Sequence, residues 1–185
     1  MEEFQITSEV ITLDRRKPTK EAAVNLNISL DDDVYYVKRI RFIHGQTLCI
    51  EESYFNKSIV TYLNKEIITE SIFNYITEGL GLSIGFADTY LHVDKLSAEE
   101  AEYLGLKKDD PKLEVESVFH LTNGQPFDFS KITYNYVQSQ FFFKLFYNLQ
   151  QTRPLLRERV FSFVQIHCII QIKEADWNDS DISSR

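Results

Sequence analysis

The chain has 185 residues, of which 28 are acidic and 20 basic, so its net charge is −8. This length and a hydrophobic fraction of 43% predict one domain with a packed core, with or without a tail. The acidic excess argues against direct nucleic-acid binding, because neutralising phosphates requires a basic surface. No stretch approaches the ~18 apolar residues of a membrane span, and the acidic N-terminus is unlike a secretory signal. We therefore expect a soluble cytoplasmic protein that does not enter a membrane.

The first half of the chain predicts a helix, a β-hairpin and two further short helices. Residues 1–17 are polar and are expected to form an N-terminal linker or first segment. A short helix follows Pro18 and ends near Asn27, because proline suits the first turn of a helix. Residues 34–43 and 48–55 are rich in strand-forming side chains and predict a hairpin that turns at Gly45. Residues 58–64 and 71–77 each begin with a serine that can cap a short helix, and 82–93 predicts a strand.

The second half predicts another helix and another hairpin. Ser97 and Glu100 have the spacing of a capping box at the start of a helix that ends at Gly105. The Asn123-Gly124 turn separates predicted strands over 112–121 and 126–136, and 141–147 is a further apolar run. We expect the main domain to cover residues 18–150, with a C-terminal tail of unknown role over 151–185.

These two halves share one pattern. Each contains a helix, a turn, a strand, a glycine hairpin and a returning strand. The turn is Asp31-Asp32-Asp33 in the first copy and Lys107-Lys108-Asp109-Asp110 in the second, and Gly45 corresponds to Gly124 at an offset of 79 residues. Two helix–hairpin units predict an α+β fold in which a single antiparallel β-sheet carries helices on one face. The other face of such a sheet can stay open for a ligand.

Arg39 and Arg41 stand out against the acidic background. Side chains two residues apart on a strand point to the same face, where two arginines repel each other unless an anion lies between them. Glu51 and Glu52, on the returning strand, could satisfy them in a surface cross-strand ion pair, and spacing alone favours this interpretation. A bound phosphate or carboxylate would suit the planar guanidinium groups equally well.

Other polar residues give weaker indications. Ser71 begins a short helix and could help to hold an anion, although most such serines only cap. Asp128, Ser130 and Tyr134 share one face of a predicted strand, a pattern that is also typical of a solvent-facing strand. The four histidines and two cysteines lack the spacing of a metal site, a disulfide framework or a catalytic triad, so we expect no metal and no cofactor.

Several motifs, taken in order, resemble a known family. Residues 23–26, the Val37-Lys38-Arg39-Ile40-Arg41 segment and Gly45-Gln46 look like the first half of a UTRA domain. Residues 71–76 resemble that family's "SLYxxL" helix start, residues 101–106 its "A..LGI" helix, and residues 124–130 its "GxPxExS" hairpin. The resemblance covers residues 8–149 and points to the effector-binding domain of the HutC subfamily of GntR transcriptional regulators.

This resemblance implies a chorismate-lyase-like α+β fold that holds a ligand between sheet and helices. It implies a non-enzymatic homodimer that senses a small anionic metabolite, either a sugar phosphate, the first candidate, or a carboxylate. DNA would be bound only through a winged-helix domain that is not present in this chain. Carried over residue by residue, Arg39, Arg41 and Ser71 would hold the anionic group. The ligand's hydroxyls or amine would meet Glu51, Asp128 and Tyr134.

The sequence departs from the family pattern in two places. The family often has glutamate where Asp128 stands, and residues 136–143 lack the arginine and the aspartate of the family's "YRxDxYxF" segment. Two other functions stay open. One is a stand-alone chorismate-lyase-like enzyme that binds an aromatic acid through the same arginines, and the other is a dimerisation module that binds no metabolite.

Overall fold

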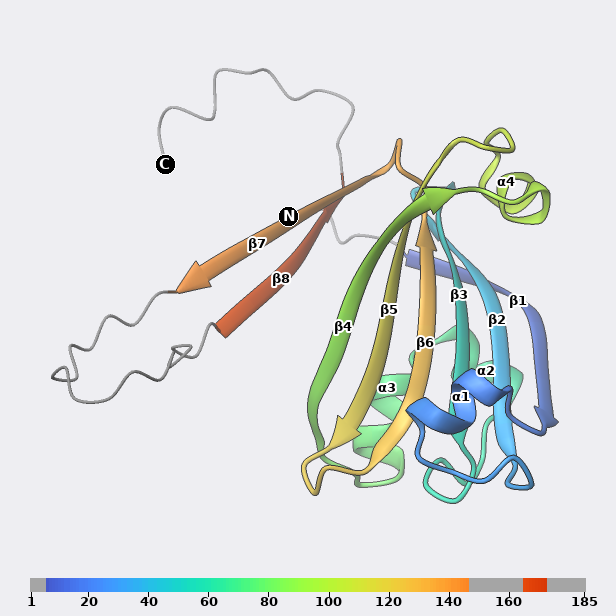
Figure 1. The fold of residues 1–185 in the computed structure, drawn as a ribbon, viewed down its shortest axis with the longest axis vertical. Helices are drawn as coiled ribbons and strands as arrows, with labels where there is room; N and C mark the ends of the chain where they lie inside the picture. Colours follow the sequence, from blue (N-terminus) through green and yellow to red (C-terminus); the bar gives the residue numbers. More distant parts are fainter. Residues whose placement is uncertain (1–5, 147–164, 173–185) are drawn as a thin grey trace, which may run out of the picture. The chain divides into compact units, whose positions relative to one another are not determined.

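The computed structural model describes residues 6–146 and 165–172, and the chain divides into two compact units, Met1–Val137 and Gln138–Arg185. The first unit is built on a six-stranded antiparallel β-sheet with the strand order β1-β2-β3-β6-β5-β4 (Figure 1). In the second unit, β7 (Ser139–Phe146) pairs with β8 (Gln165–Ile172). Apart from β8, the predicted tail over 151–185 lies outside the described residues.

The strands of the large sheet agree with the sequence analysis except at the N-terminus. They are β1 (Ile6–Arg16), β2 (Val34–Ile43), β3 (Gln46–Asn56), β4 (Ile84–Lys95), β5 (Pro111–Leu121) and β6 (Pro126–Tyr134). No strand was predicted where β1 lies. Its register shifts between Val10 and Thr12, and such a bulge interrupts the alternation by which a strand is recognised in a sequence.

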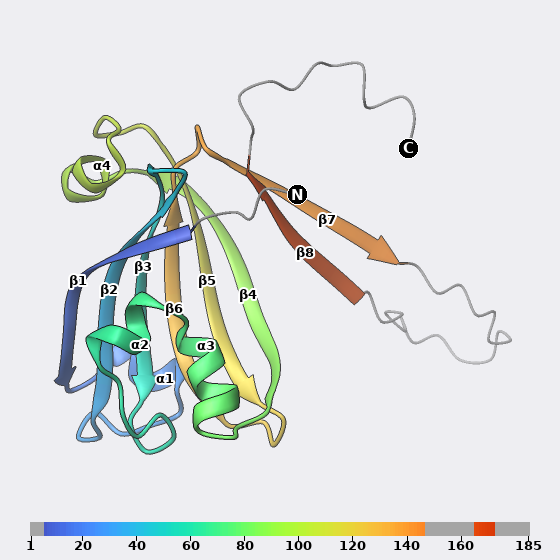
Figure 2. The same ribbon diagram turned by 180° about the vertical axis from the view of Figure 1, so that it is seen from behind.

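Helices cover parts of both faces of this sheet (Figures 1 and 2). The helices of the two predicted units, α1 (Lys20–Asn25) and α4 (Ala98–Leu104), share one face, as expected. On the opposite face lie α2 (Lys65–Thr69), α3 (Ile72–Asn74) and the π-helical turn η1 (Tyr75–Gly79), so the expectation that helices cover one face and leave the other open is wrong here. The capping box of Ser97 and Glu100 is present at the start of α4.

One predicted helix, over 58–64, is wrong. The side-chain oxygen of Asn56 accepts a hydrogen bond from the Ser58 amide and closes a turn there. The helix begins later, where the Asn64 side chain accepts from the Ile67 amide and caps α2. A serine favours a helix start but does not require one, and here two asparagines decide where the chain turns and where the helix begins.

The sheet also shows the internal repeat. One copy is β1-α1-β2-β3 and the other is β4-α4-β5-β6, so that β3 and β6 meet at the centre and β1 and β4 form the two edges. The hairpin glycines Gly45 and Gly124 both have positive φ, at 77° and 84°, a backbone conformation that residues other than glycine rarely adopt. The offset of 79 residues between them also relates β4 to β1, so the repeat contained the information for the strand that was not predicted.

The main core lies between the sheet and the α2–η1 segment. Val37 and Phe55 contribute from the sheet and Ile68, Ile72 and Ile76 from the helices, all buried. Smaller buried clusters lie under α1 and under α4 on the opposite face. A polar side chain that lies beneath the α2–η1 segment is therefore surrounded by apolar groups. Within the described ranges, no helix has the length and apolar character needed to cross a membrane.

Candidate functional site

Polar side chains cross the sheet on the face that α2 and α3 cover. Arg39 lies opposite Glu51, and Ser53 lies opposite Ser130. Residues that face each other across antiparallel strands point to the same side of the sheet. These four residues and the neighbouring Asp128 are all buried. Buried polar groups are stable only when they find hydrogen-bonding partners.

Arg39 and Glu51 form a buried ion pair. The Arg39 Nε donates to Glu51 Oε2 at 3.1 Å, and Nη2 donates to Oε1 and Oε2 at 2.9 Å each. The remaining nitrogen, Nη1, donates to the Ile68 carbonyl in α2. The pair predicted across the hairpin is present, but in the interior and not on the surface. Arg39 thereby ties the sheet to the helix layer.

Arg41 is held much less tightly. Its Nη1 lies 3.9 Å from Glu51 Oε2, and its side chain is 30% exposed. Its Nε is buried and has no hydrogen-bond partner. A guanidinium N–H buried without an acceptor is unfavourable. Arg41 therefore has a donor directed at an acceptor that the described residues do not supply.

A chain of hydroxyl groups leads from Ser53 to Asp128. The Ser53 and Ser130 Oγ atoms lie 2.9 Å apart, and Ser130 donates to Asp128 Oδ1 at 2.6 Å. Because the Ser130 proton is used on Asp128, Ser53 must donate to Ser130. The next pair across the sheet, Ser117 and Thr89, repeats this contact at 3.0 Å. Ser130 was predicted as a candidate from its strand face, whereas Ser53 was not, although Ser53 shares the face of Glu51.

Asp128 is fully enclosed. Burial, opposed by the hydrogen bond from Ser130 and reinforced by the negative charge of Glu51, holds the pKa of Asp128 well above its usual range. The carboxyl group is therefore more easily protonated than an exposed aspartate. In the protonated state it can donate a hydrogen bond as well as accept one.

The two other predicted site residues lie around this row. Ser71 caps α3, with its Oγ accepting from the Asn74 amide at 3.3 Å. It follows Ile68 by three residues, so the segment that Arg39 anchors leads directly into α3. Tyr134 is buried and pairs with Cys49, which itself lies opposite Arg41. Tyr134 therefore shares the sheet face of Arg41, whereas Ser71 belongs to the helix layer.

Two alternative kinds of site are poorly supported. Ser71 also lines a surface hollow of about 510 Å³, but Glu70 and Glu78 line it too, and their charges disfavour an anion there. Among the residues that the structure describes, no group of three histidine, cysteine, aspartate or glutamate side chains is placed to hold a metal ion.

Comparison with known protein families and curated sequences identifies the family of this chain. The model of the UTRA domain matches residues 2–137. The chain is 70% identical over 141 residues to YydK, an HTH-type transcriptional regulator of Bacillus subtilis, and this match covers 76% of the chain and 60% of YydK. It is 35% identical over 130 residues to the regulator GmuR of the same species, covering 70% of the chain and 55% of GmuR. The chain thus spans well under two thirds of these relatives.

Solved structures agree with the sequence match. The crystal structure of YydK superposes with a TM-score of 0.73 at 70% identity, covering 74% of this chain and 61% of that one. The effector-binding domain of the B. subtilis trehalose repressor TreR superposes with a TM-score of 0.64 at 26% identity, covering 81% and 99%. The second match covers almost all of an isolated effector-binding domain.

Proposed function

The chain belongs to the UTRA family, the effector-binding domains of GntR-type transcriptional regulators, and we propose that it senses a small anionic metabolite. A sugar phosphate is the first candidate. The observation that carries this proposal is the Arg41 side chain, whose buried Nε has no partner. A phosphate or carboxylate oxygen is the strongest acceptor for such a donor.

Local charge also favours an anion beside Arg41. Both carboxylate oxygens of Glu51 already accept from Arg39, so Glu51 compensates the Arg39 charge first. At 3.9 Å it compensates Arg41 only in part. Burial raises the pKa of Asp128, which lowers the negative charge that this carboxyl carries at a given pH. One positive charge is thus left for a ligand, with Ser71 and Tyr134 as further contacts and Arg39 and Glu51 holding the strands in place.

The proposed signal leaves the site through β1. This strand pairs directly with the arginine strand, since Val10 lies opposite Arg39 and Ser8 lies opposite Arg41. A ligand that drew β2 toward α3 would shift β1 as well, and residues 1–17 would pass that shift toward a DNA-binding domain. Such coupling requires the ligand to bind two states of the protein with different affinities. We further propose that the domain works as a homodimer and catalyses no reaction.

Thermal unfolding of the chain with glucose 6-phosphate, glucose and inorganic phosphate tests the anion site. We expect the phosphate-bearing sugar to stabilise the protein by about 2.7 kcal/mol at a hundredfold excess over its Kd, and glucose to have no effect. Arg41→Ala should remove the effect, while Arg15→Ala, at an exposed ion pair with Asp33, should keep it. An unchanged response in Arg41→Ala would place the site elsewhere.

An assay with chorismate separates sensing from catalysis. The enzyme alternative predicts steady release of product by the wild-type chain. The sensor predicts none. Turnover that is lost in Arg41→Ala would refute the non-enzymatic assignment and keep the residue in the binding site.

A further inference from the structure

Among the described residues, the edge strand β4 combines exposed apolar side chains with an edge that no strand of the large sheet pairs. We propose that two copies of this chain associate through it, with β4 of one copy pairing antiparallel with β4 of the other. The inference rests on the proposed function only in that a dimer is expected. It adds the surface, the register and the residues that specify them.

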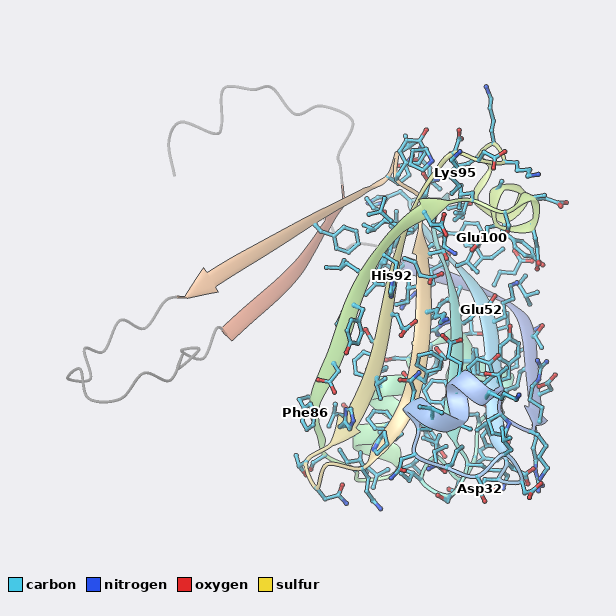
Figure 3. All side chains as sticks on the ribbon, in the orientation of Figure 1. Asp32, Glu52, Phe86, His92, Lys95 and Glu100 are labelled. Carbon is cyan, nitrogen blue, oxygen red and sulfur yellow. The ribbon has the colours of Figure 1, made fainter. Side chains whose placement is uncertain are left out.

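β4 is exposed along almost its whole length. Every residue from Gly85 to Lys95 is exposed, including four large side chains, with Val93 at 83%, Tyr90 at 60%, Phe86 at 52% and Leu91 at 49%. The strand runs along one side of the sheet, and Figure 3 shows Phe86 and His92 on it. Only β5 pairs with β4 in the large sheet, so the backbone groups on its other side have no strand partner there. A long apolar edge of this kind is a template for another strand.

The opposite edge, β1, shows what a protected edge looks like in this sheet. β1 is the counterpart of β4 in the repeat, yet a bulge interrupts it between Val10 and Thr12. Its apolar residues Val10 and Leu13 pack against the main core, and Asp14 and Arg16 form an ion pair at 2.6 Å near its end. β4 pairs regularly with β5 from Phe86 onward, without a bulge. The β1 edge is therefore irregular and packed on the core, whereas the β4 edge is regular and suited to pairing with another strand.

The charges of β4 are complementary to themselves in one register. With a two-fold axis through Tyr90, perpendicular to the sheet, Asp88 of each copy lies opposite His92 of the other. Moving the axis to Leu91 would place Asp88 opposite Asp94, and like charges facing each other destabilise a strand pair. Moving it to Thr89 would place Asp88 opposite Tyr90 and His92 opposite Phe86, which leaves no pair of opposite charges across the junction. The sequence of β4 therefore favours the register centred on Tyr90.

On the other face of the paired strands, apolar side chains from the two copies would lie next to each other. Thr89 contacts Ser117, which lies opposite Ser130, so the odd-numbered residues of β4 face the α2 side of the sheet. In the Tyr90 register, Leu91 lies opposite Thr89 of the other copy and Val93 lies opposite Ala87. Pairing would cover Leu91 and Val93 and join the two sheets into one.

Sedimentation velocity of the full chain over a range of concentrations tests the surface. We expect a dimer that Val93→Lys weakens at least tenfold, because a charge would replace an apolar contact at the junction. Val24→Lys is the matched control: Val24 is 80% exposed on α1, so this variant should dimerise normally. A monomeric wild-type chain, or a Val93→Lys variant that dimerises like the wild type, would overturn the proposal.

A charge swap tests the register. His92→Asp places two carboxylates opposite each other and should weaken the dimer, and adding Asp88→His should restore it by exchanging the partners. Failure of the double variant to recover would overturn the Tyr90 register. Thermal unfolding of Val93→Lys with glucose 6-phosphate keeps the two proposals apart. If Val93→Lys weakens the dimer as expected but glucose 6-phosphate stabilises neither the wild type nor the variant, the sensing proposal fails and the interface stands.

Discussion

Arg39 and Glu51 lie directly opposite each other on β2 and β3, and three N–H···O contacts join the guanidinium to the carboxylate. The pair is buried, and the fourth contact of Arg39 reaches α2. This relationship separates two arginines that look equivalent in the sequence. Arg39 is a structural bridge between layers, whereas the buried Nε of Arg41 has no hydrogen-bond partner among the described residues.

Breaking the Arg39–Glu51 pair should destabilise the fold strongly. Arg39→Met leaves a buried carboxylate without its partner, which typically costs about 3–5 kcal/mol. The double variant Arg39→Met/Glu51→Leu should recover most of that loss, because no charge then stays buried. Urea unfolding measures both values. Arg15→Met, at an exposed ion pair, is the control and should cost no more than about 1 kcal/mol. If Arg39→Met lowered the free energy of unfolding by less than about 1 kcal/mol, Glu51 would have to be solvated in the folded protein.

Asp128 should make stability depend on pH in a defined direction. Its pKa is raised by burial in the folded state, whereas it is about 3.9 in an unfolded chain. Protonated Asp128 therefore stabilises the fold fully below pH ~4, and this contribution is lost as the pH rises toward the folded-state pKa. Asp128→Asn keeps an acceptor for Ser130 and removes the titration. The variant should gain stability relative to the wild type as the pH rises, by up to about 1.4 kcal/mol per pH unit.

Denaturant unfolding of the wild type and Asp128→Asn at a series of pH values provides that comparison. Ser8→Ala, on β1 and away from the titrating group, serves as a second reference whose difference from the wild type should not change with pH. If the stability of Asp128→Asn relative to the wild type instead fell as the pH rose, Asp128 would be an ionised group stabilised in the folded state.

Cys49 should be inert in the folded protein. Burial, with a smaller contribution from Glu51, raises the pKa of its thiol to about 12, and only the thiolate reacts with alkylating reagents. In a Cys168→Ser background, iodoacetamide should label Cys49 only when the protein opens. A ligand that binds the folded state should slow this labelling further. Rapid complete labelling in native buffer would contradict the packing of Arg41, Cys49 and Tyr134 on the sheet.

Ser97 should contribute to stability through the α4 cap. Its Oγ accepts from the Glu100 amide, and the Glu100 carboxylate accepts from the Ser97 amide. Ser97→Ala removes the first of these bonds and should cost about 1 kcal/mol, whereas Ser97→Asp should be nearly neutral. Thermal unfolding at one pH measures the difference. Equal stability of the two variants would mean that packing of α4 on Ile50 and Leu96, and not the cap, defines its start.

The sequence alone determined those features that depend on neighbours along the chain. The capping box at Ser97, the glycine turns at Gly45 and Gly124 and the strand over 34–43 follow from hydrogen bonds and dihedral preferences within a few residues. The common face of Arg39 and Arg41 follows from strand periodicity in the same way. The strand within residues 1–17 was not predicted because a bulge breaks that periodicity. The helix predicted over 58–64 does not form because the Asn56 turn competes with it.

Tertiary structure alone decided which of these groups meet. Ser53 and Ser130 are 77 residues apart and touch because β3 pairs with β6 at the centre of the sheet. The Ile68 carbonyl accepts from the remaining nitrogen of Arg39, Nη1, because α2 packs over β2. All three nitrogens of Arg39 are therefore engaged, whereas the Nε of Arg41 has no partner among the described residues. Burial and charge compensation are sums over all neighbours in space. Residue spacing along the chain does not contain them.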